Sequence, residues 1–325
     1  MSNKMRFIFE PLLKTRQNVV CVDGAFEAAL QLSHWHGNNS PAELKAETTT
    51  QMAFKLIEHK NKRKYLKDIT IVSNNHFDAD GVLSALVLLN SEFAIKNKTS
   101  LINIALTGDF AEFTTGDALK AAFVIESFGD ENKSLFKEIL IKEKYPEAMQ
   151  KIYEKTFELV PSLINDITKY EHIWHDEFEF FERSERSFAL RESVVSNYSD
   201  CNLSVIESNF PLHVTAKYIT AENDIVLSVV KGLRGNLYEL DYKYYTWFDT
   251  TRPLRTKRKS FEPLMEKLNH IELNKKGLWR ITGHSPVLDW NYRLTFSDEN
   301  FNLISSGLKV YEIENILFDC LPRLI

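Results

Sequence analysis

The chain has 325 residues, of which 44% are hydrophobic and 26% are charged, with a net charge of −5 and a pI near 6.0. This length favours two domains over a single core, and the composition excludes a largely disordered chain. The acidic balance argues against a protein that binds nucleic acid through a general basic surface.

The cysteines and the N-terminal segment indicate the cellular compartment in which the protein is expected. Cys21, Cys201 and Cys320 are far apart and form no CxxC pair, which argues against a disulfide framework and a zinc knuckle. Residues 1–16 contain no signal-peptide core. No window approaches the roughly 18 uninterrupted apolar residues of a membrane span. We therefore expect a soluble cytoplasmic protein without a membrane partner, and its oligomeric state stays open.

The N-terminal part alternates between strand-like and helix-like segments. Strands are expected at residues 19–23, 69–73 and 101–106, and helices at 42–60, at 81–91 and from a cap at Asp117 to about residue 127. This alternation predicts a parallel sheet with crossover helices. Residues 130–195 have a mostly helical pattern.

From about residue 203 the composition shifts to β-branched and aromatic residues. Strands are expected at 203–208, 212–219, 224–230, 237–248, 278–282 and 292–296, with helices at 260–269 and 309–320. Such strands favour a mostly antiparallel sheet with one wet face. The predicted fold class is α/β, with an N-terminal parallel-sheet domain at 1–128, a helical connector at 129–200 and a smaller C-terminal α+β domain at 201–325.

One string, residues 76–81, is the strongest functional signal. It reads His-Phe-Asp-Ala-Asp-Gly, between an apolar β-branched run and a Leu-rich helical pattern. In an extended segment, His76, Asp78 and Asp80 would point to one face. Carboxylates are preferred by Mg²⁺ and Mn²⁺, and imidazole also suits Mn²⁺. Because ligands bind at the carboxyl ends of strands in open α/β sheets, these side chains are predicted to hold one or two divalent ions.

Other interpretations of this string fit less well. An EF-hand loop beginning at Asp78 needs a Glu at its twelfth position, where this chain has Leu89. A haloacid-dehalogenase site would place its first Asp directly after the strand, whereas residues 73–77 intervene here. A simple capping loop stays possible. The chain has no GxSxG, Walker A or GxGxxG motif.

Residues 69–89 resemble the first motif of the DHH phosphoesterase superfamily. The resemblance implies a two-metal centre, usually of manganese, that hydrolyses a phosphoester or phosphoanhydride. It also implies metal ligands on the N-terminal domain and substrate-binding groups on the C-terminal one. By analogy, His76 and Asp78 would bind one ion and Asp80 the other. Asp109, at the expected end of the next strand, matches the second motif and would bridge both ions, so that Asp80 and Asp109 are the expected catalytic residues.

The family's third motif, Asp-His-His, is absent from this chain. Asp23, at the end of the first strand, and the pair His34 and His36 are one candidate substitute. His172 and His175 are another, because their spacing puts them on one face of a helix. We prefer the first set, since Asp23 also follows a strand.

The substrate is expected to be phosphorylated. Arg252 and Arg255, in the basic run 251–259, are candidate phosphate clamps because guanidinium pairs bidentately with phosphate oxygens. Residues 257–259 are expected to form a solvated loop.

These features lead to one functional prediction and two alternatives. The chain is predicted to be a Mn²⁺- or Mg²⁺-dependent hydrolase, using two ions, that acts on a small phosphorylated substrate such as a nucleotide or oligonucleotide. The first alternative is a catalytically degraded relative that binds a phosphorylated ligand or a protein partner without turnover. The weaker one is a nuclease for single-stranded nucleic acid.

Overall fold

The computed structural model describes residues 5–255 and 257–321, so the first four residues of the N-terminal segment 1–16 lie outside the described part. The chain forms two compact units. The first unit comprises Met1–Phe178 together with Phe248–Arg252, and the second comprises Glu179–Trp247 and Pro253–Ile325. Each unit has its own sheet, which confirms the predicted α/β class with two domains.

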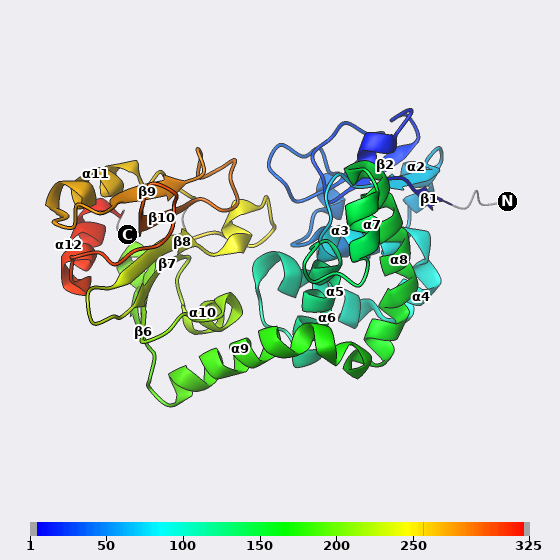
Figure 1. The fold of residues 1–325 in the computed structure, drawn as a ribbon. Helices are drawn as coiled ribbons and strands as arrows, with labels where there is room; N and C mark the ends of the chain where they lie inside the picture. The colour runs from blue at the N-terminus through cyan, green and yellow to red at the C-terminus, as the bar shows by residue number, and fades with distance from the viewer. Residues whose placement is uncertain (1–4, 256, 322–325) are drawn as a thin grey trace. The chain divides into compact units, whose positions relative to one another are not determined.

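The sheet of the first unit has four parallel strands in the order β1-β4-β2-β3 (Figure 1). Their bounds are β1 Arg6–Phe7, β2 Val19–Val22, β3 Leu30–Leu32 and β4 Ile71–Ser73. Every residue of β2 and β4 is buried, as expected for strands that are covered on both faces. These two central strands were predicted, whereas β1 and β3 are too short to stand out as apolar runs.

Helices surround this sheet and supply most of the first core. They are α1 Thr49–Glu58, α2 Lys62–Leu66, α3 Ala79–Leu89, α4 Ser91–Lys96, α5 Lys98–Phe110, α6 Gly116–Phe128, α7 Lys137–Lys142 and α8 Tyr145–Asn165, with single 3₁₀ turns at Glu10–Leu12, Ala42–Leu44 and Ile167–Tyr170. Helix α3 is buried on all sides from Ala79 to Leu88, so it is the central helix. Helix α8 lies beside α7 (Figure 1).

The expected connector of residues 129–200 is divided between the units. Helices α7 and α8 belong to the first unit, and α8 contributes Ile152 and Val160 to its core. Helix α9, Glu171–Ala189, begins in the first unit and ends in the second.

The strand predicted at 101–106 is wrong, because these residues lie in α5. Leu101, Ile104 and Ala105 are the buried positions, and their i, i+3, i+4 spacing is helical. A short apolar run fits a strand or a helix equally well when its flanks carry no clear signal. Asp109 therefore lies in the last turn of a helix instead of at a strand end. Similarly, α6 is capped by Thr115, two residues before the predicted Asp117.

The second unit has a six-stranded sheet in the order β5-β6-β7-β8-β10-β9. The strands are β5 Val194–Tyr198, β6 Leu203–Ser208, β7 Ile225–Val230, β8 Leu237–Tyr242, β9 Leu278–Thr282 and β10 Arg293–Ser297. All neighbours are antiparallel except β6 and β7. Helices α11, Glu262–Ile271, and α12, Val310–Cys320, lie together on its apolar face (Figure 1).

The strand predicted at 212–219 is also wrong, because it is helix α10, Val214–Thr220, preceded by a cap at His213. Strands β6 and β7 are parallel neighbours, and a parallel pair needs a crossover connection, usually a helix. The pairing of the sheet thus overrides the alternating pattern of these residues. Short 3₁₀ turns at Ser199–Cys201 and Tyr244–Trp247 complete the unit.

None of the helices within residues 5–255 and 257–321 combines the length and the hydropathy needed to cross a membrane.

Candidate metal centre

Three neighbouring strands of the first unit end beside one another and present polar side chains there. Asp23 directly follows β2, His34 comes two residues after β3, and His76 comes three residues after β4. Because these strands are parallel, their carboxyl ends share one edge of the sheet. Asn74 links two of them, since its Nδ2 donates to the carbonyl of Asp23 at 3.1 Å and its Oδ1 accepts from the amide of His76 at 2.7 Å.

Four side chains form the first ligand group: Asp23, His34, Asp80 and Asp109. His34 Nε2 lies 3.1 Å from Asp23 Oδ1, 3.2 Å from Asp109 Oδ2 and 3.7 Å from Asp80 Oδ2. All four side chains are at least 96% buried, because the largest exposed fraction among them is 4%. Three carboxylates and one imidazole therefore converge on one buried point.

Asp23, His76 and Asp78 form the second ligand group. His76 Nε2 lies 2.6 Å from Asp78 Oδ2 and 3.2 Å from Asp23 Oδ2. Asp23 belongs to both groups and directs one carboxylate oxygen at each histidine. The shared position is thus that of Asp23, whereas Asp109, from which bridging was expected, lies in the first group alone.

The backbone orients two of these ligands. His34 Nδ1 lies 2.6 Å from the carbonyl of Glu47, and because a carbonyl only accepts, this nitrogen carries the proton and Nε2 faces the carboxylates. Asp80 accepts from the amides of Thr49 and Thr50 at 2.6 and 2.7 Å. These amides are the first of α1, where the helix dipole favours a negative charge.

Asp78 also acts as a cap, as the capping interpretation requires. Its Oδ1 accepts from the amide of Gly81 at 2.7 Å, at the start of α3. Its other oxygen faces His76, so capping leaves this oxygen in the second ligand group. The helix begins at Ala79, which means that Asp80 reaches the site from a first helical turn and not from an extended segment.

The crowding of acids perturbs the site electrostatically. Burial, and then the charge of Asp23, raise the pKa of Asp80 to about 7. Burial and the charge of Asp80 likewise raise the pKa of Asp109 well above its usual range. Burial opposes a charged His34, yet its contacts with Asp109 and Asp23 raise the pKa of the imidazole well above normal. These raised pKa values mean that the group takes up protons, which reduces the repulsion among its carboxylates.

The residues present fit a divalent cation. Asp23 Oδ2, His34 Nε2 and Asp109 Oδ2 are buried without a hydrogen-bond partner in the part of the chain that the structure describes. A buried polar atom without a partner is costly. A cation in the first group would satisfy His34 Nε2 and Asp109 Oδ2, and a cation in the second group would satisfy Asp23 Oδ2. A donor set rich in carboxylate oxygens with one imidazole suits Mn²⁺ or Mg²⁺.

Gly81 is required here for space. A Cβ on this residue would lie 2.4 Å from Asn74 Nδ2 and 2.8 Å from the hydroxyl of Tyr153. Tyr153 in turn donates to the carbonyl of His76 at 2.7 Å. Two residues beside the site are not predicted from the sequence. Tyr153 lies on helix α8, far from the motif in sequence, and has no local signal. Asn74 directly follows β4, so it carries the same strand-end signal as Asp23.

The remaining predicted histidines lie elsewhere. Within residues 5–255 and 257–321, His36 belongs to neither ligand group, and the same holds for His172 and His175, which are exposed on α9. Of the two candidate substitutes for Asp-His-His, the structure brings Asp23 and His34 to the 76–81 motif.

The two predicted phosphate clamps belong to different units. Arg252, in the first unit, forms ion pairs with Glu47 and Glu112. Arg255, in the second, donates to Asn223 Oδ1 at 2.7 Å. The solvated loop expected at 257–259 is wrong for Arg258, which is buried and donates to the carbonyls of Lys243 and Trp290. Its guanidinium satisfies backbone groups.

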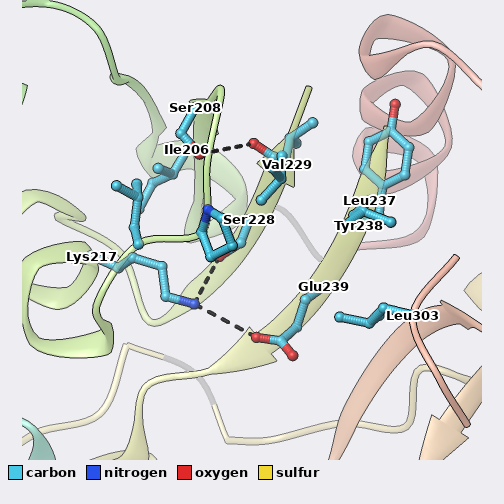
Figure 2. Close-up of a pocket in the computed structure, with 12 residues that line it drawn as sticks. Ile206, Ser208, Lys217, Ser228, Val229, Leu237, Tyr238, Glu239 and Leu303 are labelled. Atoms are coloured by element: carbon cyan, nitrogen blue, oxygen red, sulfur yellow. Dashed lines mark hydrogen bonds and ion pairs between the residues drawn. The ribbon is translucent and has the colours of Figure 1, made fainter. Parts of the chain in front are cut away.

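The second unit contains a cavity of about 150 Å³ with mostly apolar walls. Figure 2 shows Lys217 directed at Ser228 and Glu239 at one side of it. Lys217 Nζ lies 3.1 Å from Ser228 Oγ and 3.6 Å from Glu239 Oε1, and Arg293 pairs with the other oxygen of Glu239 at 3.0 Å. The charges here neutralise one another, in contrast to those of the ligand groups.

The sequence profile of a family of unknown function, DUF6687, matches residues 4–321. The chain belongs to this family. No curated protein matches it. A solved structure similar to it is that of PggH, a pGpG-specific phosphodiesterase from Vibrio cholerae, with 12% sequence identity over 93% of this chain and 81% of that one, and a TM-score of 0.35.

Proposed function

We propose that this member of the DUF6687 family is a divalent-metal-dependent phosphoesterase. It would hydrolyse a phosphoester or phosphoanhydride bond of a small phosphorylated substrate, such as a nucleotide or oligonucleotide. The observation that carries the proposal is the pair of ligand groups that share Asp23. Two adjacent divalent ions held by carboxylates and histidines are a recurring arrangement for phosphoryl-group hydrolysis.

The residues divide into two sets of ligands. Asp23, His34, Asp80 and Asp109 would hold one ion, and Asp23, His76 and Asp78 the other. Bound Mn²⁺ or Mg²⁺ supplies a water of lowered pKa and neutralises charge that develops on phosphate oxygens. The hydrogen bond from His34 Nδ1 to the carbonyl of Glu47 fixes the ring so that Nε2 is directed at the carboxylates of the first group. The amides of Thr49 and Thr50 hold Asp80 in one orientation.

A further feature concerns the compartment in which the protein acts. The three cysteines are free, which fits the reducing cytoplasm expected from the sequence.

The first test is metal binding followed by hydrolysis. Isothermal titration of the full chain with MnCl₂ should give a stoichiometry near two, and an Mn²⁺-soaked crystal should show two anomalous peaks about 3.5–4 Å apart. Mn²⁺-dependent hydrolysis of p-nitrophenyl phosphate and of short oligonucleotides should be lost in Asp80→Ala. The control is Asp117→Asn, which changes an exposed carboxylate on α6.

Two outcomes would contradict the proposal. Wild-type chain that binds no Mn²⁺ would exclude the metal centre. Chain that binds two ions but hydrolyses none of these phosphoesters would instead favour the catalytically degraded relative, which binds its ligand without turnover.

A further inference from the structure

The segment Phe248–Arg252 is distant in sequence from the rest of the first unit, yet it packs against the loop that carries His34. The amide of Asp249 donates to the carbonyl of His34 at 2.6 Å. The ring of Phe248 lies 4.1 Å, centroid to centroid, from the imidazole of His34. This segment therefore contacts both the backbone and the side chain of one proposed ligand.

Arg252 ends this segment and joins two acidic side chains. Its terminal nitrogen lies 2.9 Å from Glu112 Oε2, and its Nε lies 3.2 Å from Glu47 Oε2. The hydroxyl of Thr251 donates to the other oxygen of Glu47 at 2.6 Å. The planar guanidinium donates a directed hydrogen bond to Glu112. Its positive charge also attracts the carboxylate of Glu47, with which it forms an ion pair but no hydrogen bond to Oε2.

Glu47 belongs to the stretch that orients two ligands. Its carbonyl accepts from His34 Nδ1. The amides of Thr49 and Thr50, which follow it closely, bind the carboxylate of Asp80. A displacement of Glu47 would therefore disturb two ligands of the first group.

Glu112 lies three residues after Asp109, just beyond the end of α5. Its carbonyl accepts from the hydroxyl of Thr107 at 2.8 Å, which folds the chain back against the last turn of the helix. The position of Glu112 is therefore tied to the turn that presents Asp109.

We infer that Arg252 is a positioning residue of the metal centre: it connects the stretch that orients His34 and Asp80 to the helix end that presents Asp109. This inference rests on the proposed function. It replaces the phosphate-clamp role expected from the sequence, because both carboxylate partners of Arg252 are protein groups.

The test measures Mn²⁺ affinity in the full chain by isothermal titration. Arg252→Met should weaken the tighter Mn²⁺ site by about 10-fold, the lower end of the cost of losing a direct hydrogen-bond partner of a ligand, because Arg252 acts through Glu47 and Glu112. Arg252→Lys keeps the charge but loses the planar geometry, and it should recover only part of the affinity. Arg255→Met is the matched control and should bind Mn²⁺ as the wild type does, since Arg255 contacts Asn223 in the second unit.

A second variant separates this role from a general loss of stability. Glu112→Gln removes one arm of the bridge and should weaken Mn²⁺ binding in the same direction but less, while the far-ultraviolet circular dichroism and the metal-free melting temperature stay near those of the wild type. A merely structural arginine would lower that melting temperature and leave the Mn²⁺ affinity of the folded chain unchanged.

Two results would overturn the inference, and they are distinguishable from failure of the proposed function. If folded Arg252→Met and Glu112→Gln both bind Mn²⁺ with wild-type affinity, Arg252 does not position the ligands, and the metal centre itself still stands. If the wild-type chain binds no Mn²⁺, the metal centre fails and this inference fails with it.

Discussion

Both units bury charged side chains, but they stabilise them in opposite ways. In the second unit, Glu239 lies between Lys217 and Arg293, so its charge is neutralised by neighbouring protein groups. In the first unit, three carboxylates surround His34, and several of the atoms facing one another have no hydrogen-bond partner in the described residues. A charge that neighbouring side chains neutralise calls for no added ion, whereas buried carboxylates that crowd together without hydrogen-bond partners indicate a site for a cation.

The largest expected effect comes from the shared ligand. Asp23→Asn removes a carboxylate from both ligand groups and should weaken Mn²⁺ binding by more than about 100-fold, beyond the usual cost of losing an orienting partner alone. It should also abolish Mn²⁺-dependent hydrolysis. Glu239→Gln, in the paired cluster of the second unit, should leave Mn²⁺ binding unchanged in the same titration. Equal losses in both variants would break the contrast between the units.

The buried carboxyl of Asp241 allows an experiment on whether protonation stabilises the second unit. Burial raises the pKa of this carboxyl from 3.8 to about 7. Below pH 4 the folded and unfolded states are both protonated, but between pH 4 and 7 only the unfolded state ionises, so stability falls as the pH rises. Relative to Asp241→Asn, the wild type should lose up to about 4 kcal/mol across this range. Urea denaturation at several pH values measures this difference, and parallel curves for the two chains would contradict it.

Metal should stabilise the first unit alone. At a free Mn²⁺ concentration of 100 times the Kd, mass action adds about 2.7 kcal/mol to the stability of the state that binds it. Hydrogen exchange should therefore slow in the core around α3 and β2 and stay unchanged in the sheet of the second unit, and EDTA should reverse the effect. Equal protection of both sheets by Mn²⁺ would show that the ions do not act through the ligand groups.

The smallest effect concerns space beside the 76–81 motif. Gly81→Ala forces a methyl group against Asn74 and Tyr153 and should cost about 1–3 kcal/mol, the usual cost of overpacking. The control is Gly116→Ala at the start of α6, where a Cβ would lie 3.6 Å from Phe178 in ordinary contact. Thermal denaturation compares the two. Equal stability of both variants would mean that the motif has more room than these distances allow.

The sequence predicted the parts of the site that follow strands. Asp23, His76 and Asp78 adjoin buried β-branched runs, and such runs are visible as local periodicity. Asp109 is predicted for a different reason, since the sequence places it at the end of a strand. In the structure it lies in the last turn of α5. Helix α5 can approach α3 there because Gly108 has no side chain, and a Cβ would lie 2.8 Å from that of Ala79.

The tertiary structure decided between residues that the sequence left equivalent. His34 and His36 are two positions apart, and only the first lies in a ligand group. Arg252 and Arg255 share one basic run, yet they belong to different units and have different partners. Charge and residue type are local properties, but the partners of Arg252 are far away in sequence.

By itself, then, the sequence determined the chemistry of this protein's centre: a strand-end motif of alternating imidazole and carboxylates, and a second strand-end carboxylate upstream. Only the tertiary structure decided that Asp23 is the residue common to both ligand groups, that Asp109 arrives on a helix, and that Arg252 joins two carboxylates beside them. The physical reason is that donor atoms are a property of single residues, whereas convergence on one point depends on strand order, helix packing and contacts between distant segments.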